Sequence, residues 1–301
     1  MAIETRVDGD LVRRQAPAKV NLYLHVLGRR ADGYHDIDSL IAFADVSDEI
    51  EAMRSNRLGL KLKGPFARDL EMTDWAGNLV IRAARALAEA SGINMSVALT
   101  LHKNIPVAAG LGGGSADAAA TLRTLTKMWD LDISEDDLLV MAESLGADLP
   151  ACLNQLPVFV GGIGGDLNQA PELPSAWLVL VNPGMPMVTA EVFRSLERPP
   201  SIAARFDESP DDVYALATAL ASRSNDLEGV AIRLMPQIVG VIEALAHSEA
   251  CLLARMSGSG ATCFGVFATE SAARSAAVEI SGNHSAWWVK AVQMLGSGKD
   301  Q

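Results

Sequence analysis

Three consecutive glycines lead directly into an alanine-rich segment, and this junction constrains the fold more than any other part of the sequence. Apolar or small residues from Pro106 onward precede the glycine-rich turn Gly110–Ser115, and Ala116–Trp129 has the composition of a helix. Glycine lets backbone N–H groups turn inward toward an anion, and a helix N-terminus behind them contributes about half a positive charge. The sequence therefore predicts a strand, a phosphate-binding turn and a helix in succession. The alternative is an ordinary flexible turn in which Ser115 caps the helix.

The glycine-rich turn is not one of the two common nucleotide-binding loops. The chain contains no G-x-G-x-x-G fingerprint, which argues against a dinucleotide oxidoreductase, and no Walker A sequence. It also lacks the G-x-S-x-G motif of serine hydrolases and the H-E-x-x-H motif of zinc proteases. The hypothesis that remains after these exclusions is a phosphate-binding loop of another kind.

Composition narrows the function classes further. There are 25 Lys and Arg against 37 Asp and Glu, a formal net charge of −12, whereas nucleic-acid binding demands basic surfaces. Cys152, Cys251 and Cys263 are scattered without a C-x-x-C pair, so we expect neither a disulfide framework nor a zinc site. The longest apolar stretches fall short of the roughly 18–20 residues of a membrane span. We therefore expect a cytoplasmic protein with no nucleic-acid or membrane partner, and the sequence identifies no metal ligands.

The periodicity of apolar residues predicts an α+β protein of two domains, residues 1–170 and residues 171–301. In the first domain strands are followed by helices, and in the second the order of elements matches the ferredoxin-like split pattern. The predicted strands cover residues 20–26, 58–62, 95–101, 177–181, 252–256, 262–267 and 287–292. Three helices are predicted from capping residues: one from Asn78 to Ala90 before Gly92, one from Ser134 to about Gly146, and one that begins at Asn225 and is kinked at Pro236. Two further helices are predicted over residues 189–196 and 271–280, and a loop is predicted over residues 199–212.

Four shorter motifs are each ambiguous. Lys19 and Asn21 share the polar face of a strand, which belongs either to a site or to a solvated edge. Asp148, in a G-A-D-L-P motif, either takes part in chemistry or caps the next helix. The D-G-Y-H motif of residues 32–35 and the S-G-S-G-A motif of residues 257–261 can be read simply as a surface turn and a hairpin.

Together and in this order, the motifs resemble the GHMP kinase superfamily of small-molecule kinases. P-x-x-x-G-L-G-G-G-S-A resembles its phosphate loop, and the resemblance extends over about residues 17–267. The segment Gly33-Tyr34-His35 indicates the branch that uses ATP to phosphorylate the C2 hydroxyl of a cytidylyl-methylerythritol in non-mevalonate isoprenoid biosynthesis. The resemblance implies a half like domain 2 of ribosomal protein S5 followed by a ferredoxin-like half, with ATP and Mg2+ as cofactors, in a monomer or weak homodimer.

The resemblance also implies roles for individual residues. Asp148 would be the general base, with Lys19 beside it to keep the carboxylate ionised and to offset charge on the transferring phosphoryl group. Tyr34 and Phe193 would sandwich the cytosine ring while His35 reads its edge. The implied ATP-binding residues are Lys103, Pro106, Gly110, Leu111, Gly112, Gly113, Gly114, Ser115 and Ala116, and Asn21, Thr189 and Asn225 join Asp148 among the substrate-binding residues.

Two alternatives and one departure stay open. Another GHMP kinase, acting on a mevalonate-type or sugar substrate, would lack the Tyr34-His35 segment. A non-catalytic, RNA-associated module with an S5-like half would not keep both Lys19 and Asp148. Members of the family usually carry an acidic residue in the stretch that here consists of glycine, apart from Ile163, until Asp166.

Overall fold

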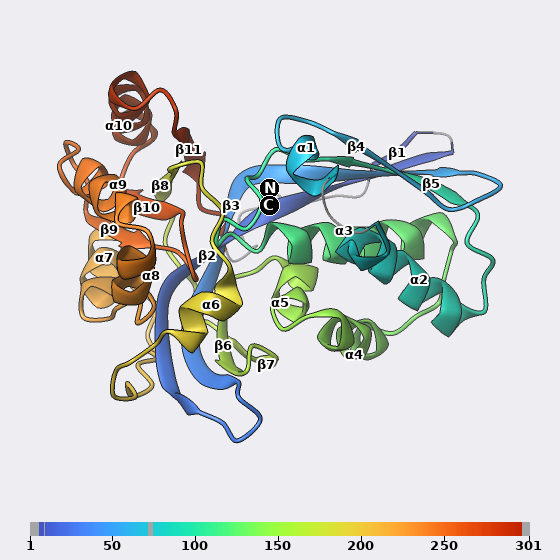
Figure 1. Cartoon of the computed structure of the whole chain (residues 1–301), viewed down its shortest axis with the longest axis horizontal. Coiled ribbons are helices and arrows are strands. Elements are labelled where there is room, and N and C mark those ends of the chain that lie inside the picture. The colour runs from blue at the N-terminus through green and yellow to red at the C-terminus, as the bar shows by residue number, and fades with distance from the viewer. Residues whose placement is uncertain (1–5, 9, 72–74, 297–301) are drawn as a thin grey trace. The chain divides into compact units, whose positions relative to one another are not determined.

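The protein forms two compact units that are interleaved along the chain. The structure, a computed structural model drawn in Figure 1, describes residues 6–8, 10–71 and 75–296. Unit 1 comprises the described parts of residues 1–18, 46–107 and 112–155, and unit 2 comprises residues 19–45, 108–111 and the described part of residues 156–301.

Unit 1 is a sheet with one face covered by helices (Figure 1). Val97, Leu99 and Leu101 are buried and the residues between them are half-buried, which is the period-two pattern of a sheet covered on one side. The strand order is β1 (Arg6–Asp8), β2 (Leu11–Arg29), β3 (His35–Arg54), β5 (Val97–His102) and β4 (Gly59–Lys63), and β2 and β3 continue into unit 2. The helices are α1 (Ala67–Glu71), the short 3-10 helix η1 (Trp75–Gly77), α2 (Leu79–Ser91), α3 (Gly113–Met128), α4 (Glu135–Leu145) and α5 (Leu149–Asn154).

The helix caps predicted in unit 1 are confirmed. The Asn78 side chain accepts a hydrogen bond from the backbone N–H of Val80 at 2.9 Å, and Gly92 ends α2 in the left-handed conformation. The Ser134 hydroxyl accepts the N–H of Asp137 at 3.1 Å and so begins α4. These contacts satisfy backbone groups that a helix end otherwise leaves unpaired, so local sequence decides where both helices begin.

Unit 2 contains the expected ferredoxin-like sheet. Its four strands are all antiparallel, in the order β11 (Trp288–Gln293), β8 (Trp177–Asn182), β10 (Cys263–Phe267) and β9 (Leu253–Met256). A second set of strands, β6 (Val158–Gly162) with β7 (Asp166–Gln169), pairs with β3. The helices are α6 (Thr189–Arg194), α7 (Val213–Ala221), α8 (Glu228–Leu234), α9 (Gln237–Ala246) and α10 (Glu270–Asn283).

Three predictions about element boundaries are wrong. The helix after the glycines begins at Gly113, not Ala116, and residues 103–112 separate it from β5, so no strand immediately precedes the turn. Pro236 separates α8 from α9 instead of kinking one helix, because proline is compatible with the start of a helix. The helix expected at Asn225 begins at Glu228. The α+β class is confirmed, and among the described residues no helix has the length and apolarity to cross a bilayer.

Candidate active site

The N-terminus of α3 is built from glycine backbone. Gly112 occupies the N-cap position with φ of +62°, and no side chain caps the helix. Ser115 lies inside the first turn, so the interpretation that it caps the helix is wrong. The first N–H groups of a helix have no partner within it, and here Gly112 and Gly113 are half-buried while Gly114 is exposed. This turn therefore offers the backbone donors and the helix dipole that an anion needs.

The residues Ala108–Leu111, here called the glycine segment, lead into α3. They are held by the loop between β9 and β10, here called the hairpin loop. The S-G-S-G-A motif does connect a hairpin, since Met256 pairs with Cys263. The Ser257 hydroxyl donates to the carbonyl of Gly110 at 3.0 Å, and the N–H of Thr262 donates to that of Ala109 at 3.1 Å. A Cβ atom on Gly110 would lie 2.5 Å from the Ser257 carbonyl oxygen. The hairpin loop thus fixes the backbone that leads into the glycine turn.

Lys19 and Asn21 lie buried on β2, with only 4% and 3% of each residue exposed, so the solvated-edge interpretation is wrong. The Lys19 Nζ donates to Asn21 Oδ1 at 3.0 Å, and Asn21 Nδ2 donates to the Ser39 hydroxyl at 2.8 Å. These two bonds determine which way the amide points. The N–H of Lys19 also donates to the carbonyl of Leu111 at 2.9 Å, and that of Asn21 to Ser257 Oγ at 3.1 Å. Through Lys19 and Asn21, β2 therefore contacts both the segment Ala108–Leu111 and the hairpin loop.

Asn225 supports the same hairpin loop. Its side-chain amide donates to the carbonyls of Met256 and Gly258, each at 2.8 Å, and its oxygen accepts the N–H of Leu227 at 3.0 Å. Both ends of this side chain are therefore occupied by backbone groups. A role in binding substrate stays a prediction for Asn225.

Asp148 immediately precedes α5 in unit 1, where α5 packs against α3. Its φ of −82° and ψ of −13° are helical, and its side chain makes no capping bond. Asp148 thus stands at the predicted N-cap position of α5, but its side chain does not cap the helix. The residue is half-buried. Lys19, its predicted companion, belongs to unit 2.

The three residues predicted to bind cytosine, here called the aromatic group, all belong to unit 2, and two of their rings are in contact. Tyr34 is 61% exposed on a turn in which Asp32 Oδ1 accepts its N–H at 3.1 Å. The rings of His35 and Phe193 lie 5.3 Å apart between centroids, tilted by 30°. Burial, and then the charge of Arg29, lower the pKa of His35 below its ordinary value. Thr189, one turn before Phe193 on α6, hydrogen-bonds Ser259 through its hydroxyl at 2.8 Å.

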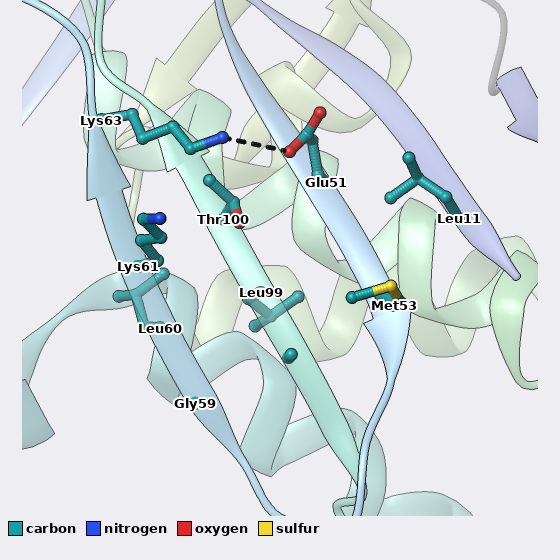
Figure 2. A pocket seen from close by; sticks show the side chains of 10 residues that line it. Leu11, Glu51, Met53, Gly59, Leu60, Lys61, Lys63, Leu99 and Thr100 are labelled. Carbon is teal, nitrogen blue, oxygen red and sulfur yellow. Dashed lines mark ion pairs between the residues drawn. The ribbon is translucent and has the colours of Figure 1, made fainter.

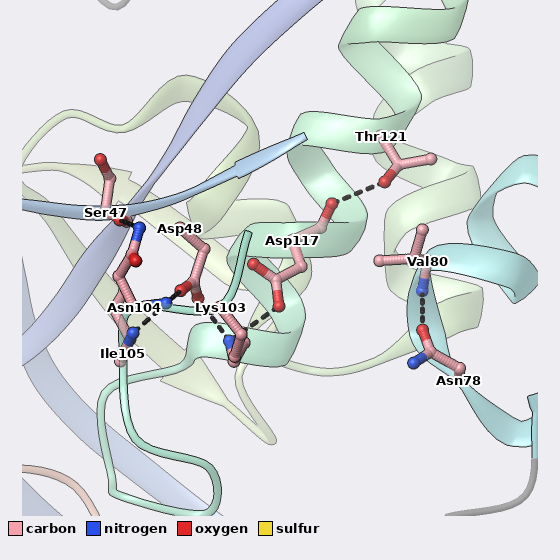
Figure 3. Close-up of polar contacts among 9 residues, drawn as sticks. All are labelled: Ser47, Asp48, Asn78, Val80, Lys103, Asn104, Ile105, Asp117 and Thr121. Carbon is pink, nitrogen blue, oxygen red and sulfur yellow. Dashed lines mark hydrogen bonds and ion pairs between the residues drawn. The ribbon is translucent and has the colours of Figure 1, made fainter. Parts of the chain in front are cut away.

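Lys103 is placed in unit 1 beneath the first turn of α3, and 2% of the residue is exposed. Its ammonium group pairs with Asp48 and, at 2.8 Å, with Asp117 (Figure 3). Burial alone would lower the pKa of Lys103, but the attraction of Asp117 and Asp48 raises it above the ordinary value. Sequence reasoning missed both acids. The available signal was Asp117, a carboxyl within the alanine-rich, core-facing part of a helix.

The glycine stretch that departs from the family pattern has a packing reason in unit 2. Gly161 and Gly162 end β6 opposite Asp166, at the start of β7. A Cβ atom on Gly162 would lie 2.6 Å from Asp166 Oδ2, and one on Gly161 would lie 2.8 Å from a guanidinium nitrogen of Arg205. The glycines leave room for the side chains of Asp166 and Arg205.

The described part of unit 1 also has a shallow hollow on the outer face of its sheet, of about 520 Å3 (Figure 2). Glu51, His102 and Glu49 could place ligand atoms within 4.8 Å of one another beside it. Glu51, however, already pairs with Arg13 at 2.9 Å and Lys63 at 3.9 Å, so its charge is compensated. None of the catalytic or binding residues predicted from the sequence lines this hollow. Its lining residues are Leu11, Glu51, Met53, Gly59, Leu60, Lys61, Lys63, Ala98, Leu99 and Thr100.

Known proteins share both the sequence and the fold. The family model of the GHMP kinase N-terminal domain matches residues 78–162, and that of the GHMP kinase C-terminal domain matches residues 203–285. A 4-diphosphocytidyl-2-C-methyl-D-erythritol kinase of Paramagnetospirillum magneticum is 47% identical, over 93% of this chain and 98% of its own length. The enzyme of the same name from Rhodospirillum rubrum is 47% identical, over 95% of this chain and 94% of its own length.

Solved structures agree with the sequence matches. The crystal structure of a 4-(cytidine 5'-diphospho)-2C-methyl-D-erythritol kinase matches with a TM-score of 0.76 and 33% identity, over 95% of this chain and all of that chain. A homoserine kinase from Cytophaga hutchinsonii has a TM-score of 0.74 at 17% identity, covering 98% of each chain, which is a likeness of fold alone. The chain therefore belongs to the GHMP kinases and, among them, to the 4-diphosphocytidyl-2-C-methyl-D-erythritol kinase family.

Proposed function

We propose that this protein transfers the γ-phosphoryl group of ATP to the C2 hydroxyl of 4-(cytidine 5'-diphospho)-2-C-methyl-D-erythritol, giving the 2-phosphate and ADP. The observation that carries this choice is the aromatic group of unit 2. Tyr34 presents an exposed ring, and the neighbouring His35 packs against Phe193, which suits a flat nucleobase. The relatives named for this substrate support the same choice.

The phosphates of ATP bind at the glycine turn. Backbone N–H groups of the first turn of α3 receive the anionic oxygens, and the helix dipole adds to the attraction. Mg2+ accompanies ATP and neutralises charge on its phosphates. Because Mg2+ keeps several waters and needs only one or two protein oxygens, the half-buried Ser115 and Asp148 fit it. The residues proposed to contact the nucleotide are Pro106, Gly110, Leu111, Gly112, Gly113, Gly114, Ser115 and Ala116, and Lys103 lies beneath Gly113 in the first turn of α3.

Asp148 receives the proton of the accepting hydroxyl, and Lys19 stabilises charge on the phosphoryl group as it transfers. The hydrogen bonds that Asn21 forms with Lys19 and Ser39 support this, because they hold the lysine ammonium group and the amide in one arrangement. Asn21, Thr189 and Asn225 complete the substrate site. The N-terminal kinase domain spans residues 1–170 and the C-terminal domain residues 171–301, and the two family models match on either side of that boundary.

The decisive experiment is an ATP-turnover panel that compares the cytidylyl-methylerythritol substrate with mevalonate, homoserine and galactose. We expect the cytidylyl compound to be phosphorylated fastest, in a reaction that requires Mg2+. Faster turnover of any other acceptor would overturn the substrate assignment. Gel filtration with light scattering tests the accompanying expectation of a monomer or weak homodimer, and cell fractionation tests the cytoplasmic location.

A further inference from the structure

A buried ionic cluster lies directly under the glycine turn of unit 1. The Lys103 ammonium group reaches Asp48 on β3 and Asp117 on α3, and all three side chains are at most 3% exposed (Figure 3). A Cβ atom on Gly113 would lie 2.9 Å from Lys103 Nζ. The ammonium group therefore contacts the underside of the first turn of α3, where the phosphate-binding N–H groups begin.

Asp48 connects this cluster to the backbone that precedes the glycine turn. Its Oδ1 accepts the N–H groups of Asn104 at 2.5 Å and Ile105 at 2.9 Å, while its Oδ2 accepts from Lys103. The main chain of Lys103 is held as well, because its N–H donates to the carbonyl of Lys63 at 2.7 Å. One carboxylate thus fixes the direction in which the chain leaves β5, and the lysine links that carboxylate to α3.

The two carboxyl groups are not equivalent. Asp48 accepts three donors, whereas Asp117 accepts one through Oδ2, and its buried Oδ1 accepts no hydrogen bond from any described residue. One ammonium group cannot neutralise two buried carboxylates. Burial, opposed by Lys103 and reinforced by Asp48, raises the pKa of Asp117 well above its ordinary value. Asp48 is therefore the carboxyl that Lys103 and the backbone hold, and Asp117 is the carboxyl on which a proton is favoured.

We propose that Asp48 and Lys103 form a buried clamp that holds residues 104–105 and the first turn of α3 in the arrangement that binds the phosphates of ATP. Lys103 is then a positioning residue beneath the turn, and its contribution to nucleotide binding is made through backbone that it holds in place. This inference rests on the proposed function, since it needs the glycine turn to be the phosphate site. It assigns roles to Asp48 and Asp117 that no sequence motif indicates.

The test is the affinity for MgATP, measured by isothermal titration calorimetry on the full-length protein below its unfolding transition. Asp48→Asn places an amide NH2 against either the two backbone N–H donors or the ammonium group. A displacement of about 1 Å at such a site can cost on the order of 100-fold, so we expect MgATP to bind at least about tenfold more weakly. Asp117→Asn resembles the neutral acid and should weaken binding less. The matched control is Glu51→Gln, the same chemical change on the same strand but in an ion pair on the outer face of the sheet, and it should leave the affinity unchanged.

A purely structural role would lower the melting temperature of Asp48→Asn and leave its MgATP affinity within about threefold of the wild type, which would overturn the clamp. If Lys103 instead contacts phosphate directly, Asp48→Asn would release its ammonium group, and the variant would bind MgATP as tightly as the wild type or more tightly. That result would also overturn the clamp. If Asp48→Asn does not fold, the double variant Lys103→Met/Asp48→Asn removes the ammonium group together with the carboxylate that it pairs with, so the net charge of the cluster is unchanged, and this variant must weaken binding too. Calorimetry needs no acceptor, so a wild-type protein that fails to bind MgATP would refute the proposed function instead.

Discussion

Replacing Gly110 by alanine tests the close approach between the glycine segment and the hairpin loop of unit 2. Gly110 has φ of +76°, and an added Cβ atom would lie 2.5 Å from the Ser257 carbonyl oxygen and 2.8 Å from that of Gly260. Both are backbone atoms, so neither can move away by rotating a side chain. The substitution must therefore shift the hairpin loop, or strain the hydrogen bond of 3.0 Å from the Ser257 hydroxyl to the carbonyl of Gly110.

The magnitude of the destabilisation follows from three contributions. An L-residue in the left-handed region costs about 1–2 kcal/mol, and the lower entropy of the unfolded alanine chain returns about 0.4–1 kcal/mol. Overpacking against fixed atoms adds about 1–3 kcal/mol. The matched control is Gly184→Ala, also in unit 2, because Gly184 has φ of +80° but its Cβ would lie at an ordinary 3.5 Å from the Ala286 carbonyl oxygen. The control carries the conformational cost without the overpacking.

Urea unfolding followed by circular dichroism measures both variants. We expect Gly110→Ala to lose about 1–3 kcal/mol more free energy of unfolding than Gly184→Ala, which is the overpacking contribution alone. We also expect it to bind MgATP more weakly, because Leu111 and the glycine turn follow directly. Equal losses of stability in the two variants would show that the close approach is absent in solution.

Three further expectations concern single side chains. Asp148→Asn should lower turnover by about 10²–10⁴-fold and stay folded, since its side chain makes no capping bond; near-full activity in a steady-state assay would remove Asp148 from the chemistry. Tyr34→Ala should weaken binding of the cytidylyl substrate by roughly 5–150-fold, because base stacking contributes about 1–3 kcal/mol. Tyr34→Phe should bind this substrate almost normally, and calorimetry should show the same MgATP affinity in both variants. Equal weakening in the two variants would mean that the hydroxyl, not stacking, holds the substrate. The unfolded chain loses the proton of Asp117 above about pH 4, whereas the raised pKa keeps that proton on the folded protein to higher pH. Folding therefore takes up a proton, and the contribution of Asp117 to the free energy of unfolding falls as the pH rises. The melting temperature of Asp117→Asn relative to wild type should therefore increase between about pH 5 and 8, and a difference that does not change with pH would mean that Asp117 is ionised in the folded protein.

Sequence patterns predicted the parts of the structure that depend on neighbours along the chain. The Asn78 cap and the left-handed Gly92 each use groups within a few residues, so residue type alone identifies them. The start of α3 was misplaced for the opposite reason. Glycine has a low helix propensity, but here the contact of Gly113 with the ammonium group of Lys103 requires a residue without a side chain inside the first turn.

The buried cluster lay beyond prediction because its members are distant along the chain. Lys103 is separated from Asp48 by 55 residues and from Asp117 by 14. A charge is tolerated in the interior only when its partners are present, and a linear pattern does not say which carboxyl will face which cation. The aromatic group differs: the family resemblance indicated Tyr34, His35 and Phe193, and the structure places the rings of His35 and Phe193 in contact.

The interleaving of the two units determines when the protein can finish folding as it is synthesised. Gly110 meets its hairpin partners only after residue 262 has been made, although the glycine segment emerges about 150 residues earlier. At about 5–20 residues per second this wait lasts roughly 8–30 s. During that time the unit 2 part of β2 lacks the Ser257 hydroxyl that will accept the N–H of Asn21. Contacts this distant in sequence slow folding and prolong the exposure of strands to other chains. A ribosome-bound chain that stops before β9 should therefore depend on chaperones, and cutting between residues 155 and 156 should not yield two independently folding halves, because β6 would lose the partner it has in β3.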